Sequence, residues 1–255
     1  MNSVKGKSLC VFSAKGGVGK STTVINLAGV FASLDKKVLI IDFELTGGAI
    51  ATYLNKPFEK SIYNFVEDYA NNRYESIRSY VTKYDDNIDF LAAPKDPRQG
   101  TRISASYIEI ILEKATNEYD IVLVDTNHVL SEFNVSLLDK CDLTLLVVSN
   151  DLLDLKNMRN LIHIFKDAEK DNYKVLINNS INPYKNYYSL YDIKNMIKAN
   201  IDYMIDASFF LKTIDNYVSD GTILTKEKAM KKSYPKVYKA YLAICNDLME
   251  MEHEK

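Results

Sequence analysis

Short apolar segments recur along the chain, and amphipathic segments separate them. Apolar runs with so little polar alternation are typical of parallel strands that helices cover on both faces of a sheet. Between these runs, apolar residues recur at steps of three and four, as at Val24, Leu27 and Phe31, which predicts helices. We therefore expect an α/β fold with a three-layer, doubly wound and mostly parallel sheet. The predicted strands are Leu9 to Ser13, Val38 to Asp42, Ile88 to Ala92, Ile121 to Asp125, Leu143 to Ser149, Val175 to Asn178 and, more weakly, Tyr203 to Ile205.

The chain is predicted to form one domain over residues 1–255, because no proline-rich linker and no internal repeat divides it. Its last helix carries an apolar stripe, which predicts docking onto the core, and Pro235 suits the first turn of that helix. Residues 61–84 are interpreted as a polar, helical surface insertion between two strands. The stripe consists of Val237, Tyr241, Ile244, Leu248 and Met251.

Composition and charge argue against several classes of protein, among them general nucleic-acid binders and membrane-spanning proteins. The 255 residues are 47% hydrophobic, as in ordinary globular proteins, and their formal net charge of -2 predicts no general attraction to nucleic acid or anionic lipid. The lysines between residues 226 and 239 form a local basic series, which we interpret as a solvated helix face and keep only as a candidate DNA contact. No apolar run approaches the roughly 20 residues of a membrane helix, and the start lacks the features of a signal peptide. We expect a cytoplasmic protein with no integral membrane segment.

The cysteines argue against a disulfide framework or a metal cluster. Cys10, Cys141 and Cys245 lie far apart in the sequence and form no C-x-x-C pair. We expect them to be reduced and buried thiols.

The strongest chemical signal is the segment SAKGGVGKST at residues 13–22, which follows a predicted strand and precedes a predicted helix. Glycines at 16, 17 and 19 let backbone N–H groups approach phosphate oxygens, while the helix dipole favours their negative charge. This is the pattern of a phosphate-binding P-loop, in which Lys20 would hold the β and γ phosphates and Ser21 would ligate Mg²⁺. The residues predicted to bind nucleotide here are Lys15, Gly16, Gly17, Val18, Gly19, Lys20, Ser21 and Thr22.

The additional lysine at position 15 makes this segment resemble the deviant Walker A motif of the MinD and ParA group of ATPases, written K-G-G-x-G-K-[ST]. The resemblance implies the P-loop NTPase fold, ATP and Mg²⁺ as cofactors, and a homodimer that encloses ATP. It also implies that Lys15 contacts the nucleotide of the other subunit. Physically, a cation supplied in trans would make dimerisation depend on the γ-phosphate and would stabilise charge in the transition state.

Two acidic residues follow the second predicted strand, at the edge where open α/β sheets bind ligands. In the family this position usually reads D-x-D, with one acid near Mg²⁺ and the other orienting the attacking water. Asp42 matches the first acid, whereas Glu44 replaces the second. A misplacement of about 1 Å can cost on the order of a hundredfold in rate, so the resemblance gives Asp42 and Glu44 catalytic roles but puts fast hydrolysis in doubt.

Asp125 ends the strand Ile121 to Asp125 and resembles the Walker B acid, which reaches Mg²⁺ through water. Family members usually continue with proline and glycine, whereas this chain continues with Asn127 and His128. The missing glycine weakens the expectation of a large nucleotide-driven switch. We assign no catalytic role to His128, because phosphoryl transfer needs positioned cations and water, not a histidine.

A late strand ends in two asparagines, Asn178 and Asn179. An asparagine amide can both donate to and accept from the edge of adenine, and family proteins place such a residue here. We expect Asn178 to contact the base, although the sequence leaves Asn179 open as the matching position.

Finer features bear on the biological role. The segments 91–94 and 135–148, and the segment 155–159, resemble the TadZ and CpaE branch, which implies a role in positioning Tad or Flp-type pilus assembly, with recruitment to the cell pole or the inner membrane face. A ParA-like DNA partition ATPase and a MinD-like division regulator remain alternatives, although net charge does not support DNA binding. A further alternative is an ATP-gated scaffold with negligible hydrolysis, suggested by Glu44 and the sequence after Asp125.

Overall fold

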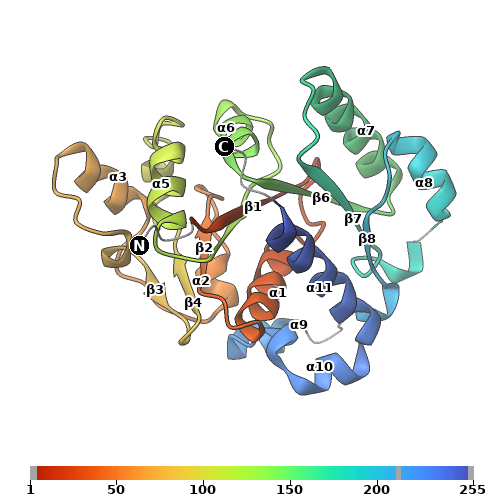
Figure 1. Cartoon of the computed structure of the whole chain (residues 1–255). Coiled ribbons are helices and arrows are strands. Elements are labelled where there is room, and N and C mark those ends of the chain that lie inside the picture. Colours follow the sequence, from red (N-terminus) through yellow and green to blue (C-terminus); the bar gives the residue numbers. More distant parts are fainter. Residues whose placement is uncertain (1–4, 186, 211–213, 252–255) are drawn as a thin grey trace.

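The computed structural model describes residues 5–185, 187–210 and 214–251. One eight-stranded sheet runs through these residues in the order β3-β4-β2-β5-β1-β6-β7-β8, and every pairing is parallel except that of β3 with β4 (Figure 1). The strands are β1 (Lys7–Phe12), β2 (Val38–Asp42), β3 (Thr82–Lys83), β4 (Ile88–Leu91), β5 (Ile121–Asp125), β6 (Leu143–Ser149), β7 (Tyr173–Asn178) and β8 (Tyr203–Ile205). The predicted α/β fold is confirmed.

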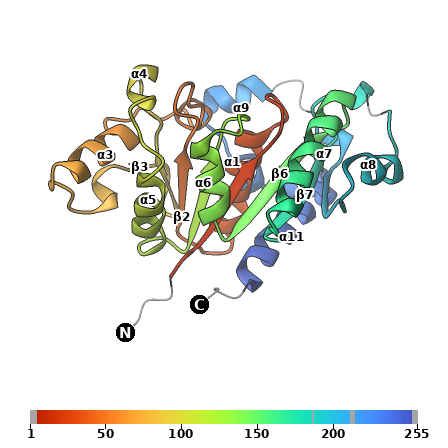
Figure 2. The ribbon, with the colours of Figure 1, turned by 90° about the horizontal axis from the view of Figure 1, so that it is seen from above.

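Helices cover both faces of the sheet, as the apolar strands require. Figure 2 shows α5, α6 and α7 along one face, and α1 and α11 pack together on the other. The helices are α1 (Lys20–Ser33), α2 (Ile50–Tyr53), α3 (Ile62–Ala70), α4 (Pro97–Gly100), α5 (Tyr107–Thr116), α6 (Glu132–Lys140), α7 (Leu152–Asp167), α8 (Leu190–Ile197), α9 (Ile214–Asp220), α10 (Lys228–Ser233) and α11 (Pro235–Glu250).

The central strands divide their side chains between two hydrophobic cores. Along β1, Cys10 and Phe12 contribute to the core under α5, α6 and α7, whereas Leu9 and Val11 contribute to the core under α1 and α11. This alternation follows from the two-residue period of a strand. The predicted stripe of α11 docks on the second core, where Tyr241 is buried, and the described part of the chain contains no helix long and apolar enough to cross a membrane.

The segment 61–84 corrects one expectation. It contains a helix, α3, but Phe65, Ile77 and Tyr80 are buried, so it is part of the core and not merely a polar surface insertion. Phe65 meets the ring of Tyr80 edge to face at a centroid distance of 5.4 Å. The end of the segment forms β3, which pairs antiparallel with β4. A two-residue strand is too short to show an alternating pattern in the sequence.

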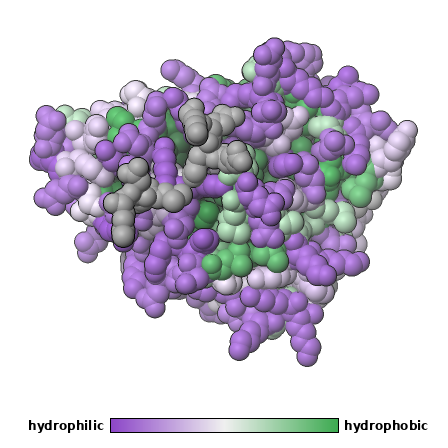
Figure 3. Space-filling view, viewed as in Figure 1, coloured by the Kyte–Doolittle hydropathy of each residue, from purple (hydrophilic) through white to green (hydrophobic). Residues whose placement is uncertain are grey.

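The basic series of residues 226–239 lies on and around α10. Lys226 pairs with Asp85, and the Lys231 ammonium lies 4.7 Å from the centroid of the Tyr238 ring. Most of the other lysines of this series are exposed, and hydrophilic side chains dominate the lower edge of the molecule in Figure 3, where α10 lies in Figure 1. These contacts fit a solvated helix face.

The sheet order places β1 at a topological switch point. From β1 the chain leads to β2 on one side, and β5 later connects to β6 on the other side of β1. Open α/β sheets bind ligands outside the carboxyl ends of the strands at such a point. The loop after Phe12 is therefore where the fold provides a ligand site.

Candidate functional site

The loop between β1 and α1 has the backbone of a phosphate-binding loop. Gly17 and Gly19 adopt φ angles of +75° and +93°, which residues with a Cβ rarely adopt. Gly19 immediately precedes α1, so the unpaired N–H groups of the first helical turn face the loop. The structure thus brings the residues 15–22 that sequence reasoning selected to one helix N-terminus.

Lys20 is buried at the base of this loop, with 8% of its surface exposed. Its Nζ donates a hydrogen bond to Ser13 Oγ at 3.0 Å, and Ser13 Oγ donates to the carbonyl of Lys15 at 2.7 Å. Burial lowers the pKa of Lys20, while the negative charge of Asp125 opposes that shift. A desolvated ammonium whose hydrogen-bond partner is a neutral hydroxyl is well suited to bind an anion.

Two predicted acids lie side by side at the carboxyl edge of the sheet. Asp42 and Asp125 are direct register partners in β2 and β5, and both are 1% exposed. Asp42 accepts hydrogen bonds from the backbone N–H of Ile50 at 3.0 Å and of Glu44 at 3.2 Å. Burial, and then the charge of Asp125, raise the pKa of Asp42 to about 8.

Asp125 differs from Asp42 in the hydrogen bonding of its carboxylate. Neither of its buried carboxylate oxygens has a hydrogen-bond partner of normal geometry. Burial raises the pKa of Asp125 to about 6, and the nearby hydroxyl of Ser21 and ammonium of Lys20 oppose the shift. Because buried charges are normally paired, these orphaned oxygens fit a site completed by a cation.

The acids fit Mg²⁺ as outer partners. Within the described ranges, no three His, Cys, Asp or Glu side chains gather closely enough to hold a metal ion by themselves. Mg²⁺ usually keeps several waters and takes one or two protein groups together with phosphate oxygens. Ser21 at the start of α1, with Asp42 and Asp125 through water, provides that kind of donor set.

Glu44 lies beside this group, half-buried, and its Oε1 accepts a hydrogen bond from the Thr46 hydroxyl at 2.9 Å. Its charge raises the pKa of Asp125 and of Asp42 and opposes the lowered pKa of Lys20, so it lies within electrostatic reach of all three. The structure therefore brings Glu44 into the same cluster, although its role there stays a prediction.

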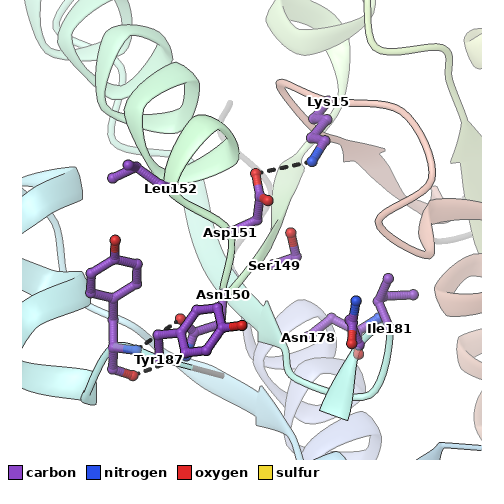
Figure 4. A pocket seen from close by; sticks show the side chains of 10 residues that line it. Lys15, Ser149, Asn150, Asp151, Leu152, Asn178, Ile181 and Tyr187 are labelled. Atoms are coloured by element: carbon purple, nitrogen blue, oxygen red, sulfur yellow. Dashed lines mark hydrogen bonds and ion pairs between the residues drawn. The ribbon is translucent and has the colours of Figure 1, made fainter. Parts of the chain in front are cut away.

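Lys15 points away from the base of the loop. Its Nζ forms an ion pair with Asp151 Oδ1 at 3.0 Å, and both side chains are nearly half exposed (Figure 4). The same oxygen accepts the backbone N–H of Asp154 at 3.1 Å, so Asp151 also caps α7. The pair borders an open pocket of about 550 Å³ that Leu152 and Tyr187 also line.

The loop after Asp125 is braced. Asn127 Oδ1 accepts hydrogen bonds from Val129 N at 2.9 Å and from Asn134 Nδ2 at 2.7 Å, and Asn134 Nδ2 also bonds to the carbonyl of Val129. His128 is exposed, with its ring close to Gly16, where an added Cβ would lie 3.4 Å from Nδ1. These hydrogen bonds form in the stretch after Asp125, where family members usually have proline and glycine.

Asn178 contacts the P-loop directly. Its Nδ2 donates to the carbonyl of Val18 at 3.0 Å, and its Oδ1 accepts from Ser180. The adjoining pocket has a volume of about 330 Å³, within the range of small-molecule sites. Besides the P-loop, five apolar or aromatic side chains line it: Tyr53, Ile181, Phe209, Phe210 and Tyr241.

Sequence reasoning missed several of these residues. Asp151 carried a signal, because an aspartate directly before an apolar helical run is typical of an N-cap. Phe209 and Phe210 carried none, because they belong to no motif and lie far from residues 15–22 in the sequence. Only the packing of separate segments brings them to the pocket.

Comparison with known proteins finds a family match and several relatives. Residues 6–182 match the family model described as AAA domain. The septum site-determining protein MinD of Helicobacter pylori is 28% identical over 165 residues, which span 64% of this chain but only 60% of that protein. The chromosome-partitioning ATPase Soj of Thermus thermophilus is 25% identical over 206 residues, or 80% of this chain and 78% of its own length.

A solved structure shares the whole architecture. The septum site-determining protein MinD of Pyrococcus horikoshii, complexed with Mg-ADP, superposes with a TM-score of 0.77 over 96% of each chain. Its sequence is 15% identical, so the likeness concerns the fold. That fold is the P-loop α/β architecture expected from the sequence.

Proposed function

Because the chain belongs to the AAA-domain family, and to the MinD and ParA group of P-loop ATPases, we propose that it binds ATP with Mg²⁺ and hydrolyses it slowly. The main support is the buried Lys20 ammonium, which donates a hydrogen bond to Ser13 Oγ at 3.0 Å. It lies near Asp125, whose buried carboxylate oxygens have no hydrogen-bond partner. The Mg-ADP bound to the structural relative supports the same ligand class.

Different residues would bind the phosphates, the metal ion and the attacking water. Backbone N–H groups of residues 16–22 and the Lys20 ammonium bind the β and γ phosphates, while Ser21 would hold Mg²⁺ directly and the two buried aspartates would hold it through water. When bound, Mg²⁺ neutralises phosphate charge during transfer. Glu44 orients the attacking water, and its added methylene makes hydrolysis slow.

We propose further that ATP drives a homodimer through Lys15. This ammonium lies at the open side of the loop, 40% exposed, and its ion pair with Asp151 is of the weak, solvated kind. A partner's γ-phosphate offers it a stronger, doubly charged acceptor. The expected test is solution mass with no nucleotide, with ADP and with ATP plus Mg²⁺. ATP alone should double the mass, and Lys15→Ala should abolish the change; a mass that ignores nucleotide would refute the dimer.

An ATP-gated scaffold is the second candidate, and Glu44 together with the braced loop after Asp125 favours it. Such a protein would bind ATP and dimerise but would turn over little. Phosphate release separates the two. Release well above background that Lys20→Ala abolishes supports the ATPase, whereas background release with intact ATP affinity supports the scaffold.

The cellular role we propose is the positioning of an assembly, most specifically Tad or Flp-type pilus assembly at the cell pole or the inner membrane face. The TadZ- and CpaE-like segments support it. The MinD and Soj relatives keep division-site placement and DNA partition as alternatives. Deleting the gene distinguishes them: loss of surface pili supports the pilus role, misplaced septa a MinD-like role, and loss of replicons a ParA-like role. Rescue by the wild type but not by Lys20→Ala would tie the phenotype to nucleotide binding.

A further inference from the structure

His128 lies at the mouth of the P-loop. It follows Asp125 by three residues, in the loop after β5, and β5 pairs with β1 as far as Asp125 and Val11. A Cβ added to Gly16 would lie 3.4 Å from Nδ1 of the imidazole, 3.5 Å from Cε1 and 3.9 Å from Cγ. The ring of this exposed side chain therefore faces the backbone of the first glycine of the loop.

The backbone that carries His128 is held by hydrogen bonds on both sides. Asn127 Oδ1 accepts a bond from Val129 N at 2.9 Å and another from Asn134 Nδ2 at 2.7 Å. Asn134 Nδ2 also donates to the carbonyl of Val129 at 2.7 Å. Asn134 belongs to α6 and is 0% exposed, so these bonds anchor the loop to a buried side chain. The loop thus presents the imidazole from a fixed backbone.

This position is on the phosphate side of the proposed nucleotide site. Mg²⁺ bound to a nucleoside triphosphate bridges oxygens of the β and γ phosphates, and Asp125 is one of the acids that would hold it. Gly16 begins the row of backbone N–H groups that would bind these phosphates. His128 adjoins both, through the chain and through space, and it does not line the apolar pocket beside Asn178.

The imidazole supplies a donor that this stretch of the chain usually lacks in the family. A neutral imidazole has one N–H donor and an imidazolium has two, whereas the side chains of proline and glycine have none. Hydrogen bonds to a charged phosphate oxygen are roughly twice as strong as those between neutral groups. ATP differs from ADP only in the γ-phosphate, so a side chain that bonds this group alone would distinguish the two nucleotides.

We propose that His128 binds the γ-phosphate, so that a side chain on a braced loop distinguishes ATP from ADP. This inference rests on the proposed function, because it assumes that the P-loop binds a nucleoside triphosphate. The role is one of binding: the imidazole donates a hydrogen bond to a phosphate oxygen and takes no proton from the attacking water.

The test compares dissociation constants for ADP and for AMP-PNP, an ATP analogue that resists hydrolysis, both with Mg²⁺, in the wild type and in His128→Ala. We expect AMP-PNP affinity to fall about tenfold and ADP affinity to stay unchanged, because only AMP-PNP carries a γ-phosphate. His128→Gln keeps a side-chain N–H donor and should lose no more than about threefold. His163→Ala, which removes an exposed histidine of α7, is the matched control and should change neither constant.

Dimerisation would also make binding depend on the γ-phosphate, so the titrations are repeated in a Lys15→Ala background, which we expect to stay monomeric. A loss of AMP-PNP affinity that His128→Ala causes in this background as well supports a contact within one subunit. A loss that disappears in this background means that His128 acts at the subunit interface, and it overturns the proposal.

Two other results would overturn the γ-phosphate contact while leaving the proposed function standing. Equal losses for AMP-PNP and ADP would show that His128 shapes the P-loop through Gly16. Unchanged affinities for both would show that His128 does not bind phosphate. A wild type that binds neither ligand overturns the proposed function as well. Thermal unfolding of His128→Ala should match that of the wild type, because the side chain is exposed.

Discussion

The two halves of the candidate nucleotide site are built on opposite principles. The phosphate half is charged and buried, and a single segment, residues 13–22, supplies most of it together with the ends of β2 and β5. The base half is apolar and partly exposed, and α2 and the segments after β7 and β8 each contribute to it. Charge recognition tolerates little displacement, whereas stacking tolerates much. The first half therefore carries a motif, and the second does not.

The largest effect should come from removing the cation of the phosphate half. Lys20→Ala deletes a buried ammonium that would face the β and γ phosphates, and we expect ATP affinity to fall at least about a hundredfold. Isothermal titration with ATP and with tripolyphosphate should show the same loss. Lys232→Ala, an exposed lysine of α10, is the charge-matched control. Normal tripolyphosphate binding in Lys20→Ala would contradict the division into two halves.

Asp125→Asn tests the acidic part of the phosphate half. The raised pKa of Asp125, about 6, means that the folded chain binds a proton more tightly than the unfolded chain. Its contribution to the free energy of unfolding therefore falls as pH rises from about 4 to about 6, by at most about 3 kcal/mol. Asp42, with a pKa of about 8, extends the fall to higher pH.

In EDTA and without nucleotide, Asp125→Asn should consequently unfold several degrees higher than the wild type at pH 7, with no gain at pH 4. The same variant should lose the Mg²⁺ dependence of ATP binding. Thermal unfolding measured across this pH range checks the first point, with Asp171→Asn as an exposed control. Equal stabilisation at both pH values would show that the effect is not the buried charge.

Phe210→Ala tests the base half. It removes a partly exposed ring that would stack on the base, so ATP affinity should fall about tenfold. Tripolyphosphate affinity should not change, because that ligand has no base. A loss shared by tripolyphosphate would mean that Phe210 shapes the P-loop and does not contact the base.

Asp151→Asn should have the smallest effect, because Asp151 lies outside both halves. Asparagine keeps the N-cap of α7 but removes the charge that holds Lys15 at 3.0 Å. Solvated pairs are typically worth about 0.5 kcal/mol, and the dimer contains two of them, so the ATP-driven dimer should tighten about fivefold. Sedimentation at several protein concentrations measures it. A weaker dimer would show that Asp151 assists Lys15 instead of competing for it.

Most of the fold was predictable because buried parallel strands leave continuous apolar runs. The strands Val38–Asp42, Ile121–Asp125 and Leu143–Ser149 have the predicted bounds. The prediction of a polar surface insertion at residues 61–84 was wrong in part. The buried aromatic residues of this segment alternate with polar ones, a pattern that resembles the sequence of an exposed helix. β3 was missed because a strand of two residues is too short to show an alternating pattern of apolar and polar residues.

The sequence by itself determined the phosphate half. Glycines with positive φ, the lysine at position 20 and the acids that end two strands act through local backbone geometry and through the common edge of a parallel sheet. Only the tertiary structure decided what Asn178, Phe209 and Phe210 touch, because their neighbours come from segments that the sequence does not link. Spacing specifies contacts within one segment, whereas contacts between segments depend on how the whole sheet packs.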